Sequence, residues 1–250
     1  MIHTPVRAVA AASAFLTRAP FVSRLAAGED DLVRGSVVFP VVGAVIGGLI
    51  GAVAVAQVEL GVPLMLAGVI AVVVEVAITG ALHVDGLADS VDGLAGRNPQ
   101  HALAIMRDHS IGVYGTCAIV LDLLVKVAVI AALPTSETIV TLVAVYAVSR
   151  AAPLPLAAAL PYAGSDGTGR VIVERTGWVH AAVGAGIAAS VALVCVGRWA
   201  LVLIGCLVAV TVAVGFAARR RLGGISGDVL GASVELTTAA GLVAAVLWLT

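Results

Sequence analysis

Three aspartates recur at helical spacing in the most polar stretch of the chain, residues 80–93. Asp85, Asp89 and Asp92 stand at positions i, i+4 and i+7, which on an α-helix at about 100° per residue places them within an arc of roughly 60°. Like charges on one helix face repel and need a neutralising cation. Clustered carboxylates without nitrogen or sulfur ligands suit Mg²⁺ or Mn²⁺. The spacing therefore predicts a metal site; the alternative is a solvated acidic helix end paired with arginines.

The residues around these aspartates suggest room for a substrate. Gly86 and Gly93 have no side chains, so a phosphorylated molecule could approach the carboxylates closely. His83 lies about 160° around the same helix from the aspartates, and we do not expect it to bind the same metal. It is either a structural histidine or a substrate contact.

A second polar constellation lies at residues 104–115. Arg107 offers a bidentate clamp for phosphate, and Asp108 adds a further carboxylate. Arg97, a few residues earlier, is a second candidate for neutralising phosphate oxygens.

A third constellation spans residues 219–235, where three arginines precede a glycine-rich turn. The arginines alone are typical of an anchor to anionic lipid headgroups. The turn carries Gly223, Gly224, Ser226 and Asp228, and a glycine-rich turn that opens a helix presents free N–H groups to phosphate. We therefore expect this turn to contact substrate.

Charged residues also occur inside apolar stretches. Asp122 and Lys126 are four residues apart and are expected to pair. Glu75 has no evident partner in the sequence; it is either a structural hydrogen-bond acceptor or a functional carboxylate beneath the site.

The elements that must position these residues are membrane helices. The chain has 250 residues, of which 61% are hydrophobic and 12% charged, against ~45–50% and ~25% in soluble domains. A soluble globule could not cover that much apolar surface, which excludes a soluble enzyme, a disordered chain and a nucleic-acid binder. We predict an all-α polytopic membrane bundle that forms one catalytic domain over residues 1–250.

At ~20 apolar residues per span, seven spans are expected. They are residues 37–58, 62–82, 111–133, 137–160, 178–197, 199–217 and 235–249. Gly43, Gly47 and Gly51 form two overlapping GxxxG steps in the first span and predict a close helix contact. The N-terminal segment is expected to stay in place, lying on the membrane or partly inserted.

The charges predict the orientation of the bundle. Twelve of the fourteen Lys and Arg residues, Arg150 among them, are assigned to the N-terminal segment and to the side with loops 83–110, 161–177 and 218–234. The positive-inside rule makes that side cytoplasmic. Eleven of the fifteen Asp and Glu residues, Glu235 included, are assigned to the same side. The positive-inside rule concerns only Lys and Arg, so it does not explain why the acids gather there.

Together, these segments resemble the cobalamin-5'-phosphate synthase family, whose activity is adenosylcobinamide-GDP ribazoletransfer. The resemblance covers nearly the whole chain, and its most specific segment is the first acidic one. At His109-Ser110, where Ser-Arg often occurs in the family, one candidate phosphate-binding arginine is missing. The matching segments are residues 39–43, 82–93, 105–108, 111–115 and 223–232.

The resemblance implies a Mg²⁺-dependent enzyme of the cell inner membrane. It would join adenosylcobinamide-GDP to α-ribazole or α-ribazole 5'-phosphate and release GMP, in the last assembly step of the cobalamin nucleotide loop. Asp85, Asp89 and Asp92 would hold the metal, with Asp108 or Asp228 completing its shell. Expected partners are the two substrates and the lipid bilayer, and a homo-oligomer or a complex with other late cobalamin-pathway enzymes is compatible with this function.

Two other functions fit parts of the pattern. A CDP-alcohol phosphotransferase of lipid synthesis also gathers aspartates at a membrane surface, but Asp89 stands where that family has an arginine. A divalent-cation or organic-anion transporter would carry its polar residues near the bilayer midplane, whereas most charges here fall on one surface.

Overall fold

The computed structural model describes residues 4–18, 28–164 and 167–249. Among these residues the secondary structure is helical, apart from an isolated bridge between Tyr162 and Ile225. The all-α prediction is therefore confirmed. The main bundle consists of α4 (Phe39–Glu59), α5 (Leu64–Thr79), α8 (Val113–Ala132), α9 (Thr135–Ala151), α12 (Trp178–Val196), α13 (Ala200–Leu222) and α14 (Gly227–Leu249).

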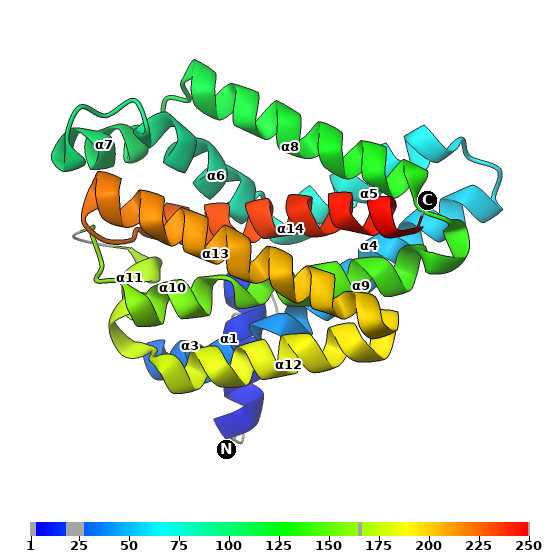
Figure 1. The fold of residues 1–250 in the computed structure, drawn as a ribbon, viewed down its shortest axis with the longest axis horizontal. Helices are drawn as coiled ribbons and strands as arrows, with labels where there is room; N and C mark the ends of the chain where they lie inside the picture. The colour runs from blue at the N-terminus through cyan, green and yellow to red at the C-terminus, as the bar shows by residue number, and fades with distance from the viewer. Residues whose placement is uncertain (1–3, 19–27, 165–166, 250) are drawn as a thin grey trace.

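Shorter helices gather around this bundle. In Figure 1, α1 lies across the direction in which α9, α12 and α14 run. The expected position of this segment, on the membrane or partly inserted, stays a prediction. The short helices are α1 (Thr4–Leu16), α3 (Glu29–Gly35), α6 (Leu82–Gly93), α7 (Pro99–Met106), α10 (Pro153–Ala159) and α11 (Thr168–Arg175).

The long apolar helices fit a polytopic membrane protein. Five helical segments of the described chain are long and apolar enough to cross a membrane, and a sixth is possible if α5 and α6, bent by 89°, form one broken span. One of the five segments, residues 178–222, contains both α12 and α13. Figure 1 shows that α13 folds back along α12. Seven spans as the exact number remains a prediction.

The tightest helix contact joins α4 to α9. A Cβ added to Gly43 or Gly47 would lie 2.2 Å from the carbonyl oxygen of Tyr146 or Leu142, respectively. The glycines thus let the two backbones touch, as the GxxxG pattern predicts.

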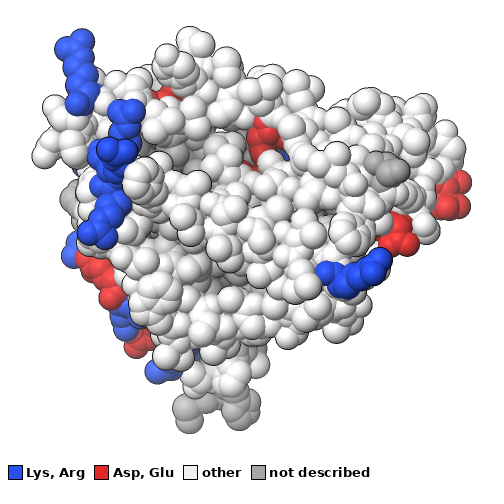
Figure 2. Space-filling view, viewed as in Figure 1, with Lys and Arg blue, Asp and Glu red and all other residues white. Residues whose placement is uncertain are grey.

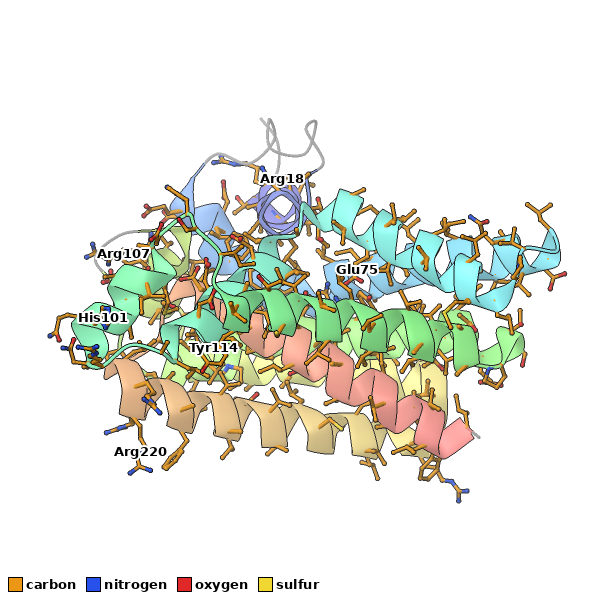
Figure 3. The ribbon with its side chains drawn as sticks, turned by 90° about the horizontal axis from the view of Figure 1, so that it is seen from above. Arg18, Glu75, His101, Arg107, Tyr114 and Arg220 are labelled. Atoms are coloured by element: carbon orange, nitrogen blue, oxygen red, sulfur yellow. The ribbon has the colours of Figure 1, made fainter. Side chains whose placement is uncertain are left out.

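The charges divide between the two ends of the bundle and its centre. Figure 2 shows basic side chains gathered mainly at one end and acidic ones at both, and Figure 3 shows Arg107, His101 and Arg220 at the end opposite the α4–α5 turn. The assignment of Arg150 and Glu235 to a loop face was wrong. Arg150 is fully buried in α9 and Glu235 is 2% exposed in α14.

The two buried residues belong to an ionic cluster within the bundle. Lys126 Nζ donates to Glu75 Oε1 at 3.0 Å and to Glu235 Oε2, and lies 3.2 Å from Asp122 Oδ2. Arg150 NH2 lies 4.0 Å from Glu75 Oε1. The expected pairing of Asp122 with Lys126 is confirmed, and Glu75 has the partner that the sequence did not reveal. The ion pairs between α5, α8 and α14 offset the free-energy cost of burying these charges.

Candidate active site

A sharp bend carries the aspartate helix α6 away from the bundle axis. Gly80 and Ala81 both adopt left-handed backbone conformations, with φ of 63° and 58°. Ala81 is the only described non-glycine residue with positive φ, a conformation that costs energy for a residue with a side chain. These two residues produce the 89° angle between α5 and α6.

After the bend, α6 packs directly against the first turns of α14. A Cβ on Gly86 would lie 2.7 Å from the carbonyl oxygen of Asp228, and one on Gly231 would lie 3.4 Å from His83 Cα. The two glycines therefore permit a backbone-to-backbone contact. As a result Asp85 of α6 and Asp228 of α14, remote in sequence, face the same cavity.

This cavity has a volume of about 300 Å³, within the size range of small-molecule sites. Its polar lining includes a guanidinium group, Arg107, whose charge acts on the Asp228 carboxyl. The other polar side chains of the lining are His83, Asp85, Tyr162, Ser226 and Asp228.

Two helices begin at the cavity wall. α14 starts at Gly227, and Ser226 Oγ caps it by accepting the Val229 N–H at 3.3 Å. α11 starts directly after Gly167, and a Cβ on Gly169 would lie 2.6 Å from Gly227 Cα. Gly167, Gly169 and Gly227 all line the cavity. The positive ends of two helix dipoles therefore lie at a site that also carries Arg107, an arrangement suited to phosphate.

Asp89 lies one turn beyond Asp85 on α6 and is half-buried. Burial, followed by the charges of Asp85, Asp228 and Asp92, raises the pKa of Asp89 to about 7. A carboxyl whose pKa is raised by burial and by neighbouring carboxylates is typical of functional sites and of cation sites.

Asp92 has a different environment from the other two aspartates. Its Oδ2 accepts the Gly112 backbone N–H at 2.7 Å, and its Oδ1 accepts the Gly115 N–H at 2.8 Å. Both oxygens thus satisfy free N–H groups at the start of α8. A Cβ on Gly112 or Gly115 would lie within 2.5 Å of this carboxylate.

Seven residues proposed from the sequence do not line the cavity: Asp89, Asp92 and Glu75, already placed, and four others. Asp108 is exposed and accepts the Ser110 backbone N–H at 3.0 Å, a bond that lowers its pKa. Arg97 is in the α6–α7 connection, where its backbone N–H donates to His101 Nδ1. Gly223 ends α13 with φ of 74°, and Gly224 packs against the Pro161 carbonyl.

His83 lines the cavity while being only 4% exposed. Burial, together with the positive charges of Arg150 and Lys126, lowers its pKa to about 3, so the ring is neutral. Within the described residues, its Nδ1 has no hydrogen-bond partner.

The sequence interpretation missed two parts of the lining. Gly164 and Gly167 precede α11 and Gly169 lies in its first turn, whereas Phe15 and Leu16 come from α1. The spacing Gly-x-x-Gly-x-Gly ahead of a helix was a readable signal for the first part. Nothing in the sequence indicated that α1 reaches the site.

Comparison with known proteins decides the family. Residues 8–246 match the family described as cobalamin-5-phosphate synthase. The chain belongs to this family. The proposed resemblance is confirmed, and the cobalamin-5-phosphate synthase match covers α6, every helix between α6 and α14, and α14 up to residue 246.

Curated relatives carry a consistent name. A protein of Chlorobaculum tepidum is 42% identical over 218 residues, covering 84% of this chain and 85% of the relative. One from Azorhizobium caulinodans is 36% identical over 99% of this chain and 98% of its own length, and one from Klebsiella pneumoniae 35% over 92% and 96%. All three are named adenosylcobinamide-GDP ribazoletransferase. No solved structure matches the chain.

Proposed function

We propose that this chain is an adenosylcobinamide-GDP ribazoletransferase. It joins adenosylcobinamide-GDP to α-ribazole, or to its 5'-phosphate, and releases GMP. The family match over residues 8–246 supports the reaction. The observation that carries the proposal is the cavity in which Asp85, Asp228 and Arg107 meet the N-termini of α11 and α14. Carboxylates for a cation beside positive groups for phosphate are what transfer from a pyrophosphate requires.

The residues present suit Mg²⁺ held jointly with substrate. Within the described chain, no three His, Cys, Asp or Glu side chains form a ready-made metal cage. Mg²⁺ is commonly bound through one or two carboxylates plus substrate phosphates. Asp85 and Asp228 line the cavity, and Asp89 feels the charge of both, so we assign these three to the metal. Asp92, assigned to the metal from its spacing, has both oxygens engaged by α8.

The chain's own groups explain much of the proposed reaction. The ribazole 3'-hydroxyl oxygen forms a bond to the phosphorus that carries the cobinamide arm, and the bond from that phosphorus to the GMP oxygen breaks. A carboxylate of the Asp85–Asp89–Asp228 group accepts the hydroxyl proton. Arg107 and the N–H groups that open α11 and α14 offset the negative charge that builds on the phosphate oxygens.

Bound Mg²⁺ would supply further charge stabilisation to the pyrophosphate and its leaving group. The neutral His83 ring, buried at the cavity wall, adds no positive charge to that site. We further propose a multi-pass location in the cell inner membrane with this cavity on the cytoplasmic side, supported by the arginines at that end.

The test uses purified protein in lipid nanodiscs, with adenosylcobinamide-GDP, α-ribazole and Mg²⁺. We expect equal amounts of cobalamin product and GMP, and loss of both on adding EDTA. Asp85→Asn and Asp228→Asn should each lower kcat/KM at least a hundredfold. Glu59→Gln and Glu137→Gln, exposed carboxylates far from the cavity, are the matched controls. Transfer from CDP-diacylglycerol instead, or full activity of the Asp85 variant, would contradict the proposal.

A further inference from the structure

The cavity lining contains two chemically unlike sets of residues, called here the charged wall and the apolar wall. One is the charged wall already described, with Asp85, Asp228 and Arg107. The other is apolar and aromatic and comes from α1, α4, α6, α7 and the segment after α10. Its main residues are Phe15, Leu16, Phe39, Leu82, Met106 and Tyr162.

The apolar wall has a firm aromatic base. The Phe15 and Phe39 rings stack with centroids 5.6 Å apart and planes 10° from parallel. Phe39 is 1% exposed and Leu16 is 2% exposed, so both are held rigidly by the surrounding protein. Leu82 is 41% exposed, so a ligand can contact its side chain. A flat apolar molecule laid against this wall would continue an existing stack.

The helix that supplies Phe15 is held to the bundle at both ends. The Arg18 backbone N–H donates to the Ile78 carbonyl at 2.8 Å, just beyond the end of α1. Near its start, Arg7 forms an ion pair with Asp31 of α3 at 2.8 Å. These anchors make α1 a built part of the cavity, so that Phe15 is held in place for a ligand.

Resting on the proposed function, we propose that this wall binds the base of the nucleoside acceptor, the methylated benzimidazole of α-ribazole. That base is flat and bicyclic, and its outer ring is a methylated benzene ring where purines have a ring containing two nitrogens. Guanine, the base of the donor, presents an amino group and a carbonyl oxygen. Five of the six wall residues offer such groups no side-chain hydrogen bond, and burying an unpaired polar group is unfavourable.

Size and position favour the same assignment. A cavity of about 300 Å³ is at the small end for ligand sites and suits a nucleoside far better than a whole corrinoid. The two walls enclose one space, so a base on the apolar wall leaves its ribose directed to the carboxylates and Arg107. Phe15 and Leu82 are thereby specificity-determining residues for the acceptor, and Phe39 supports the Phe15 ring from behind.

The test compares Phe15→Ala and Leu82→Thr with wild type in nanodiscs. Both should raise KM for α-ribazole at least tenfold and leave KM for adenosylcobinamide-GDP within twofold. The preference for α-ribazole over an α-linked adenine riboside should fall about tenfold, the scale expected for small apolar pocket contacts. Val6→Ala, exposed on α1 away from the cavity, and Phe216→Ala, exposed on α13, are the controls.

Equilibrium binding of radiolabelled α-ribazole, measured without donor, provides a readout independent of turnover. Weaker binding by both cavity variants, with unchanged melting temperatures, supports the wall as the base site even if transfer itself is absent. Unchanged α-ribazole binding, or a rise in KM for adenosylcobinamide-GDP alone, would overturn it while leaving the transferase function intact. Absence of any transfer by wild type would instead count against the proposed function.

Discussion

Asp92 and Asp85 share one helix face but have different surroundings. Asp85 is exposed to the cavity, whereas Asp92 is 9% exposed and accepts hydrogen bonds from two backbone N–H groups at the start of α8. The i, i+4, i+7 spacing places the carboxylates on one side of α6, and the neighbouring helix decides which remain available. We therefore expect a structural role for Asp92 and a metal-binding role for Asp85, and measurements on variants can distinguish the two.

Replacement of Asp92 by alanine should destabilise the protein more than it changes metal use. The buried Gly115 N–H and the part-buried Gly112 N–H at the start of α8 lose their acceptor, at a cost of about 1–3 kcal/mol. We expect a lower melting temperature with an unchanged Mg²⁺ concentration for half-maximal activity. Asp85→Asn should do the reverse, and a large shift in Mg²⁺ dependence for the Asp92 variant would show that Asp92 binds the metal.

The raised pKa of Asp89 predicts a pH dependence of stability without metal. The pKa of about 7 lies above the usual value of 3.8, so the folded state holds a proton that the unfolded state has released between these values. In EDTA the melting temperature should therefore fall as pH rises from about 4 to about 7. Mg²⁺ should restore stability at the upper pH, and Asp89→Asn should remove this part of the slope. An identical slope in that variant would refute the assignment.

At the scale of elements, the glycine face of α4 sets the distance to α9. A Cβ on Gly47 would lie 2.2 Å from the Leu142 carbonyl oxygen, so Gly47→Ala must push the two helices apart. Overpacking of this kind costs about 1–3 kcal/mol. Gly186→Ala on α12, where an added Cβ meets nothing within 4 Å, is the control and should be neutral. Equal melting temperatures for the two variants would contradict the close contact.

At the scale of the whole molecule, Lys126 joins carboxylates from three helices. Lys126→Met leaves Glu75, Asp122 and Glu235 without their shared cation in the bundle interior. Removing one partner of a buried ion pair costs about 3–5 kcal/mol, so we expect a strong loss of thermal stability in detergent. Arg198→Met, at the opposite end from the cavity, should have little effect. Wild-type stability of the Lys126 variant would mean that the cluster is not ionised.

Orientation in the membrane is the second molecular property to measure. In a background without the native cysteines, Gln100→Cys on α7 and Leu60→Cys between α4 and α5 place single thiols at exposed positions on opposite ends. In intact cells a membrane-impermeant maleimide should label only the Leu60 variant, because the arginine-rich end faces the cytoplasm. Labelling of the Gln100 variant alone would invert the topology.

The sequence by itself determined the class of molecule and its family. High apolar content requires helices in lipid, since backbone groups there must bond internally. Local relations were also readable: the glycine face of α4 and the Asp122–Lys126 pair depend only on helical periodicity. Asp85, Asp228, Arg107, His83 and Ser226 were proposed from the sequence and do line the cavity.

Only the tertiary structure decided how these residues combine. Asp85 meets Asp228 because a bend at Gly80 and Ala81 turns α6 onto α14. The helical periodicity within either segment cannot predict that contact between α6 and α14. The same packing places the Asp92 carboxylate against the start of α8, where it accepts two hydrogen bonds. It also leaves Asp108 and Arg97 outside the cavity and places Phe15 of α1 in the cavity lining. Such contacts join residues distant in the chain, so their geometry arises from packing and not from local sequence pattern.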